Sequence, residues 1–168
     1  IARDPEAAER FAREAKAALR IKSEHVSKVL DIDRLADGTP YMVMEFLDGI
    51  DLDERLEQRG PLPVPEAVDA IIQACAALSE AHAQGIIHRD IKPANLFETR
   101  DARGGSVIKV LDFGISKITG ERIGALTAPD AAMGSTAFMS PEQLVSSRDV
   151  DRRADVYALG VSLYELIT

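Results

Sequence analysis

The chain has 168 residues, of which 46% are hydrophobic and 29% are charged, a balance that is ordinary for a soluble globular protein with one core. The formal net charge of −8 argues against nucleic acid as the main partner, because phosphate backbones are bound by basic surfaces. A single cysteine, no apolar run long enough to span a bilayer and no signal peptide predict a cytoplasmic protein.

The first part of the chain predicts a helix followed by a pair of strands. Asp4 is a suitable N-cap with a proline directly after it, and apolar side chains at helical spacing extend the helix over residues 4–20. Strands are expected over residues 26–33 and 39–46, because a turn signal containing Gly38 separates them.

The rest of the chain predicts helices around one hairpin. A short helix is expected over residues 51–58, and a long helix over residues 65–85 has apolar side chains in register on one face. Residues 96–98 and 107–111 predict a hairpin with glycines in its turn. Residues 154–167 predict a buried helix that is apolar on most sides. The pattern as a whole predicts an α+β fold.

Two loop segments carry the most specific chemistry. Residues 88–95 read His-Arg-Asp-Ile-Lys-Pro-Ala-Asn, and Asp-Phe-Gly follows at residues 112–114. Phosphoryl transfer from ATP to a hydroxyl needs a carboxylate that orients the hydroxyl, oxygen ligands for Mg²⁺, and positive charge near the transferred phosphate. Those residue types are supplied by Asp90, Lys92, Asn95 and Asp112. One Asp with one Asn suits Mg²⁺, which takes few protein oxygens.

Each motif by itself has a plainer interpretation. Asp-Phe-Gly alone is commonly a turn after a strand, and His-Arg-Asp alone is commonly a charged loop. The two motifs together, at a spacing that fits one short hairpin between them, are far more specific than either alone.

These motifs and four further segments resemble the eukaryotic-like serine/threonine protein kinases, most closely the bacterial branch. Residues 11–15 are similar to the C helix, residues 41–49 to the strand and hinge behind the adenine, residues 134–142 to the end of the activation segment, and residues 155–160 to the start of the F helix. The resemblance implies a protein-kinase-like fold, with a partial small lobe in residues 1–46 and the hinge and an incomplete, mainly helical large lobe in residues 47–168.

The resemblance also implies roles for individual residues. Asp90 would be the catalytic base, Lys92 the cation near the γ-phosphate, and Asn95 and Asp112 the metal ligands. ATP and Mg²⁺ are the implied cofactors, and Lys92, Asn95 and Asp112 would contact them together with Glu45, Leu47, Asp48 and Phe97. Lysine two residues after the catalytic aspartate is the family's mark of serine and threonine acceptors in protein substrates.

A second group of residues would support or regulate the site. Its members are Glu14, Met44, His88, Arg89, Phe113, Gly114, Thr127, Ser135, Glu142 and Asp155. In the family, the aspartate matching Asp155 holds the main chain of the His-Arg-Asp loop, and Met44 would be the gatekeeper beside the adenine. Ser135 would hydrogen-bond the catalytic aspartate and lysine. Thr127 is the preferred phosphosite, because its phosphate would be able to pair with Arg89.

Three other residues have structural interpretations. Cys75 lies inside the apolar stripe of the long helix and is expected to be a small buried hydrophobe. His25 and His82 are expected to be structural or surface histidines rather than ligands. In the family, the glutamate matching Glu142 pairs with an arginine that this chain does not contain.

Two parts that a protein kinase needs are not found in these residues. They are a glycine-rich loop over the phosphates and a strand lysine that pairs with the C-helix glutamate. Lys109 superficially resembles that lysine, but it belongs to the strand that leads to Asp112. The chain therefore resembles an internal part of a kinase domain, and residues 1–168 alone are expected to have little or no activity. Nothing in the sequence indicates an oligomeric state.

Two alternatives to an active protein kinase remain open. One is a pseudokinase or nucleotide-binding interaction module, which would gain weight if the strand lysine were missing from the parent protein. The other is a small-molecule phosphotransferase of related fold. The Ser-Pro-Glu sequence at residues 140–142 and the lysine at position 92 disfavour the second alternative.

Overall fold

The computed structural model describes residue 15 and residues 18–113, 136–145 and 150–168. Most of the helix expected over residues 4–20 lies outside this part, although Ala15 and Ala18 are helical and buried. The expected site residues that lie outside the described part are Glu14, Gly114, Thr127 and Ser135.

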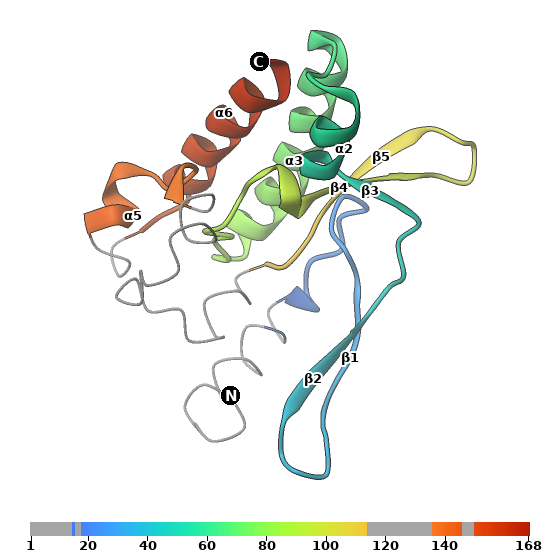
Figure 1. Ribbon diagram of the computed structural model, residues 1–168. Coiled ribbons are helices and arrows are strands. Elements are labelled where there is room, and N and C mark those ends of the chain that lie inside the picture. Colours follow the sequence, from blue (N-terminus) through green and yellow to red (C-terminus); the bar gives the residue numbers. More distant parts are fainter. Residues whose placement is uncertain (1–14, 16–17, 114–135, 146–149) are drawn as a thin grey trace.

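The first sheet is an antiparallel hairpin of β1 (Val29–Arg34) and β2 (Pro40–Met44), as the sequence predicted, with slightly shorter strands. Gly38 at the turn has a φ of 85°, a conformation that glycine adopts without steric penalty. Figure 1 shows this hairpin extending away from the helices. Val26, expected at the start of the first strand, instead forms a parallel bridge with Val110.

The second sheet has three antiparallel strands in the order β3 (Gly49–Asp51), β4 (Leu96–Arg100) and β5 (Ser106–Val110). The last two strands form the predicted hairpin. A Cβ atom at Gly49 would lie 2.0 Å from the main-chain oxygen of Glu98, so the close approach of β3 to β4 requires glycine.

Two helices follow β3 along the chain. The carboxylate of Asp51 accepts a hydrogen bond from the Glu54 amide at 2.9 Å and caps α2 (Leu52–Arg59), as the sequence predicted. Helix α3 (Val64–Ala83) buries a stripe of alanines, namely Ala67, Ala70, Ala74, Ala77 and Ala81. Its end, just before Gly85, also agrees with the prediction.

The expectation that Cys75 is buried is wrong, because the side chain is exposed. Successive helical residues are about 100° apart, so Cys75 points away from the stripe that contains Ala74. Cys75 was placed inside the apolar stripe of the helix, whereas its side chain lies on the neighbouring, exposed face.

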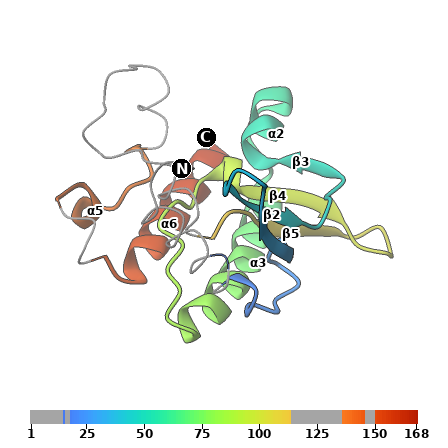
Figure 2. The same ribbon diagram turned by 90° about the horizontal axis from the view of Figure 1, so that it is seen from below.

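The last two helices are α5 (Pro141–Val145) and α6 (Arg153–Ile167). Figures 1 and 2 both show α6 beside α3. Residues 154–167 were expected to form a buried helix, and this is wrong, because Val156 is 62% exposed and Tyr164 is 68% exposed. Only the face with Ala154, Ala158 and Leu166 is buried.

One hydrophobic core joins the segment before β1 to β5 and helices α2, α3 and α6. Leu52, Leu78, Leu96 and Val110 are among its buried members. No helix within the described ranges has both the length and the apolar character needed to cross a membrane. The core holds the end of α3 close to the β4–β5 hairpin, and the loops that connect these elements carry the candidate site.

Candidate active site

The segment after α3 contains the first motif. Residues 88–92 have no regular secondary structure, and they lead through a 3-10 turn (η1, Pro93–Asn95) into β4. The Asn95 amide nitrogen donates to the main-chain oxygen of Asp90 at 2.7 Å and to its carboxylate at 3.1 Å. The Lys92 ammonium lies 3.1 Å from the same carboxylate. Three of the predicted site residues therefore contact one another.

His88 connects this loop to the strand that precedes Asp112. Its Nε2 bonds the main-chain oxygen of Leu111 at 2.7 Å, and the Asp90 amide donates to its Nδ1 at 3.3 Å. A carbonyl only accepts, so the proton lies on Nε2 and the ring is neutral. Complete burial lowers the pKa of His88 below its ordinary value, although the Leu111 bond and three nearby aspartates oppose this shift.

The main-chain amide and oxygen of Leu111 both form hydrogen bonds with residues of the first motif. Besides the His88 bond, the Leu111 amide donates to the main-chain oxygen of Asn95 at 3.0 Å. The next residue, Asp112, is exposed and has a φ of 53°, a conformation that aspartate tolerates better than most residues. Phe113 is buried, and its ring meets the His88 ring edge to face with centroids 4.8 Å apart. These contacts fix the residues on both sides of Asp112 to the segment that contains Asp90 and Asn95.

The main-chain amide and the main-chain oxygen of Arg89 are both hydrogen-bonded by side chains. Arg89 has a φ of 68°, which is strained for a residue with a side chain. The buried carboxylate of Asp155 accepts from the Arg89 amide at 2.7 Å and from the His88 amide at 2.9 Å. The Gln143 side chain donates to the Arg89 oxygen at 3.0 Å. The main-chain bonds expected for Asp155 are therefore present.

Asp155 has a third partner in His82, whose Nε2 lies 2.7 Å from the carboxylate. His82 is therefore a structural histidine, which is one of the two roles expected for it, structural or surface. His25 is also structural, since its Nδ1 lies 3.1 Å from the main-chain oxygen of Ile108 in β5. The role of Gln143 was not predicted, because its partner lies 54 residues away along the chain.

The expected hinge lies at the end of β2. Met44 is partly buried there, and the Glu45 carboxylate accepts from the Lys109 ammonium at 2.8 Å and from the Lys28 amide at 2.9 Å. Partial burial raises the pKa of Glu45, but these two hydrogen bonds outweigh it and hold the pKa below its ordinary value. The Glu45 side chain is therefore engaged with β5, and its main-chain amide donates to the Lys28 oxygen at 2.9 Å. Its main-chain oxygen is the group that remains for contact with a nucleotide.

The remaining expected contacts lie close to this hinge or at the far end of the site. Leu47 is partly buried and Asp48 is exposed just before β3, while Phe97 is partly buried on β4. Glu142 is exposed in the first turn of α5, so its carboxylate remains in contact with water and does not carry the cost of a buried charge.

The donor atoms present suit Mg²⁺. The amide nitrogen of Asn95 is used by Asp90, so its amide oxygen remains to accept a cation. Asp112, the second residue of the expected pair of metal ligands, is exposed. Within the described residues no three His, Cys, Asp or Glu side chains form a cluster of metal ligands. A two-residue set of oxygen ligands is nevertheless what Mg²⁺ needs when phosphates and water complete its shell.

Comparison with known proteins decides the family. The sequence model of the protein kinase domain family matches residues 2–168. The chain belongs to the protein kinase family. Among curated relatives of this kinase-family chain, the serine/threonine-protein kinase pkn3 of Myxococcus xanthus is 42% identical over 161 residues, or 95% of this chain and 29% of the relative. PknB of Mycobacterium tuberculosis is 38% identical over 171 residues, or 100% of this chain and 26% of that protein.

Solved structures agree with the family. The crystal structure of the Mycobacterium tuberculosis PknI kinase domain matches this kinase-family chain with a TM-score of 0.76 and 32% identity, and the match covers 99% of this chain and 59% of that chain. The predicted α+β, protein-kinase-like fold and the resemblance to bacterial serine/threonine kinases are confirmed. The chain spans less than a third of the length of the curated relatives described above.

Proposed function

We propose that the protein containing this chain transfers the γ-phosphoryl group of ATP to serine or threonine hydroxyls of protein substrates. The observation that supports this most directly is the pair of hydrogen bonds at Leu111, because they bind the residue before Asp112 to the segment that contains Asn95 and Asp90. The names of the relatives, which are serine/threonine kinases, favour the same acceptors.

In this proposal Asp90 orients the acceptor hydroxyl and takes its proton as the new oxygen–phosphorus bond forms and ADP leaves. Lys92, 3.1 Å from the Asp90 carboxylate, contributes positive charge where the transferred group carries its negative charge. The Asn95 bonds to both the main chain and the side chain of Asp90 fix the orientation of the base.

Asn95 and Asp112 are the residues that would hold Mg²⁺. The ion, when bound, neutralises phosphate charge and orients the phosphates. We assign nucleotide contacts to the main-chain oxygen of Glu45 and to Leu47, Asp48 and Phe97.

The division of the chain follows from the same assignment. Residues 1–46 would belong to the small lobe, and residues 47–168 to the hinge and the large lobe. Thr127 would be phosphorylated and pair with Arg89, whose main chain is fixed by Asp155 and Gln143. The cytoplasm is the proposed location, because it supplies ATP and keeps the free thiol of Cys75 reduced.

The substitution Asp90→Asn in the full-length protein tests the proposal. General-base catalysis contributes about 100-fold to 10,000-fold, so transfer of labelled phosphate to a serine-containing protein substrate is expected to fall by at least about 100-fold. Binding of a fluorescent ATP analogue is expected to change by less than about threefold, since the base does not hold the nucleotide.

Asp69→Asn is the matched control, because this exposed aspartate lies on α3 outside the site. Transfer by Asp90→Asn at a rate close to that of the control would refute the role of Asp90. A wild-type protein that binds ATP and transfers no phosphate would refute the activity and support the pseudokinase alternative. Residues 1–168 alone are expected to turn over little ATP, and turnover equal to that of the full-length protein would contradict this.

A further inference from the structure

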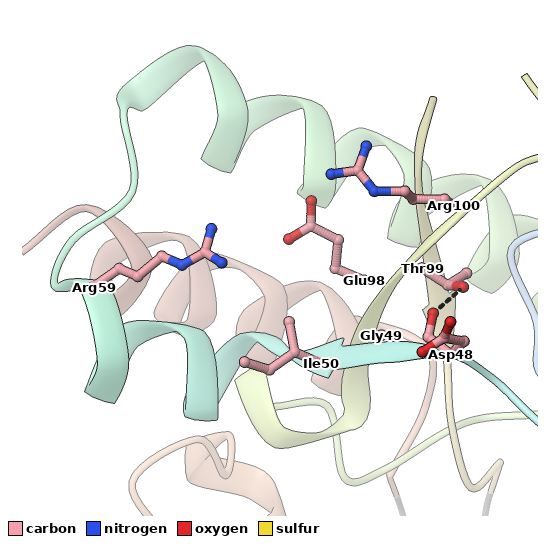
Figure 3. A pocket seen from close by; sticks show the side chains of 7 residues that line it. All are labelled: Asp48, Gly49, Ile50, Arg59, Glu98, Thr99 and Arg100. Atoms are coloured by element: carbon pink, nitrogen blue, oxygen red, sulfur yellow. Dashed lines mark hydrogen bonds between the residues drawn. The ribbon is translucent and has the colours of Figure 1, made fainter. Parts of the chain in front are cut away.

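A cavity of about 300 Å³ between α2 and strands β3 and β4 is balanced in charge. Its charged lining residues are Arg59, Arg100, Asp48 and Glu98 (Figure 3). Two guanidinium groups and two carboxylates leave no excess of either sign. The cavity therefore favours neither an anionic nor a cationic ligand, and a buried side chain of α5 carries more information.

Gln143 is the buried residue of α5. Its side chain is 2% exposed, whereas Leu144 is 56% exposed and Val145 is 88% exposed. A buried amide is costly unless both of its ends have hydrogen-bond partners. The side chain through which α5 meets the rest of the molecule is therefore polar, and its contacts are directional.

Both ends of the Gln143 amide bind main-chain groups. Its Oε1 accepts from the Ser140 amide at 3.1 Å, and its Nε2 donates to the Arg89 oxygen at 3.0 Å. These partners fix the orientation of the amide, because its nitrogen only donates and its oxygen only accepts. Ser140 is completely buried, and the main-chain amide of Gln143 donates to its oxygen at 3.0 Å. Gln143 thus joins the start of α5 to the loop that carries Asp90.

The bond to the Arg89 oxygen acts on the peptide group that connects Arg89 to Asp90. A peptide group is planar, so its orientation is set when both its oxygen and its N–H are bound. Gln143 binds the oxygen, and the N–H of Asp90 donates to Nδ1 of His88 at 3.3 Å. The second distance is long for a hydrogen bond, so the Gln143 bond is the stronger of the two restraints.

The preceding peptide group is held separately, because the Asp155 carboxylate accepts from the Arg89 amide at 2.7 Å. The strained φ of 68° at Arg89 lies between these two peptide groups. A main chain in this region relaxes to other conformations unless its surroundings hold it. Asp155 restrains the side of Arg89 toward His88. Gln143 restrains the side toward Asp90.

We propose that Gln143 is a positioning residue that ties the orientation of Asp90 to the docking of α5. With α5 in place, the Arg89–Asp90 peptide group is fixed, and the Asp90 carboxylate keeps its contacts with Lys92 and Asn95. With α5 displaced, this peptide group rotates and Asp90 leaves that arrangement. The inference rests on the proposed function, in which Asp90 is the base for phosphoryl transfer.

Hydrogen exchange and steady-state kinetics of the full-length protein test this coupling. Gln143→Met has a side chain of similar size and removes both hydrogen bonds. The amides of Arg89 and Asp90 are expected to exchange at least about tenfold faster in this variant, because the loop opens more easily. Mass spectrometry of the segments that contain residues 88–92 measures this exchange.

The kinetic effect of Gln143→Met should fall on kcat. Transfer of labelled phosphate is expected to lose at least about tenfold in kcat, which is the factor that corresponds to one hydrogen bond of typical strength. The KM for ATP is expected to change by less than about twofold, since Asp90 orients the acceptor and does not hold the nucleotide.

Gln143→Glu is the second variant, and it also serves if Gln143→Met does not fold. It keeps an acceptor for the Ser140 amide but places an oxygen opposite the Arg89 oxygen, so exchange and kcat are expected to change in the same direction. Ser140→Ala is the matched control, because it removes from the same segment a buried hydroxyl that has no hydrogen-bond partner among the described residues. Exchange and kcat of this control are expected to stay within about twofold of the wild type.

Three results would overturn the proposal. One is exchange of the Arg89 and Asp90 amides at the wild-type rate in the folded Gln143 variants. Another is a loss of kcat in Ser140→Ala equal to that in Gln143→Met, which would indicate a general disturbance of α5. The third is a KM for ATP that rises as much as kcat falls. A wild-type protein that transfers no phosphate would refute the proposed function instead, and the exchange rates would then decide alone whether Gln143 holds the loop.

Discussion

Removal of the Asp155 carboxylate should both destabilise the protein and disturb the loop that carries Asp90. The carboxylate is fully buried and accepts from the amides of His88 and Arg89. Hydrogen bonds to a charged group contribute about 1.5–3 kcal/mol each, and a buried donor left unpaired is costly. We therefore expect Asp155→Ala to lower the free energy of unfolding by about 3–5 kcal/mol.

The conservative variant Asp155→Asn keeps one acceptor oxygen and replaces the other with a donor. It should retain one of the two main-chain bonds and lose the other, so a decrease of about 2–3 kcal/mol is expected. This variant matters because a domain with a typical stability of about 5–15 kcal/mol will more readily remain folded with the smaller loss.

The effect on activity follows from the strain at Arg89. Its φ of 68° costs on the order of 1–3 kcal/mol, and the bonds to Asp155 and Gln143 oppose its relaxation. Without Asp155 the main chain at Arg89 should relax and move the adjacent Asp90. We expect kcat to fall more than KM for ATP rises, because the loop orients the base rather than the nucleotide.

The assay combines urea unfolding with steady-state transfer of labelled phosphate. Glu165→Gln is the control, since it removes one charge from an exposed position on the same helix and should change stability by less than about 0.5 kcal/mol. If Asp155→Ala lowers stability by less than about 1 kcal/mol, or leaves kcat unchanged, the reasoning is refuted.

Two further predictions concern the pH dependence of stability and the contact between the hinge and β5. Burial lowers the pKa of His88 in the folded protein, so only the unfolded chain takes up this proton as the pH falls below about 6.5, and stability should decline there by up to about 1.4 kcal/mol per pH unit. Urea unfolding at pH 7.5 and 5.5 should show a smaller loss of stability in His88→Gln than in the wild type. Equal losses in the two proteins would contradict this origin. Glu45 and Lys109 form an ion pair in which the side chains are 23% and 12% exposed. A double-mutant cycle with Glu45→Gln and Lys109→Met should therefore give a coupling free energy of about 1 kcal/mol. Additive effects of the two substitutions would show that the pair contributes nothing to stability.

Much of the local structure was predictable because its causes lie close together in the chain. Asp51 is three residues before the amide that it caps, and Gly38 lies within the turn that it enables. The apolar stripe of α3 repeats at helical spacing, which identifies the helix and its buried face. The motifs at residues 88–95 and 112–114 likewise indicated the family from residue types and spacing, and the comparisons confirmed it.

The errors arose where the buried face of a helix was misjudged. Cys75 was assigned to the apolar stripe of its helix, and α6 was assigned to the interior because it is apolar on most sides. Exposure depends on which face of the helix meets a neighbour. The apolar residues of α6 spread around the helix, so its composition alone does not identify the buried face.

The sequence by itself determined the order of the elements, their caps and turns, and the residue types available for phosphoryl transfer, because these depend on neighbours a few positions away. The tertiary structure decided that Gln143 binds the Arg89 oxygen, that Glu45 pairs with Lys109 and that Arg59 and Arg100 line one cavity. Those partners are separated by roughly 40 to 65 residues. Packing of the core alone brings such distant segments into contact, and no local pattern encodes it.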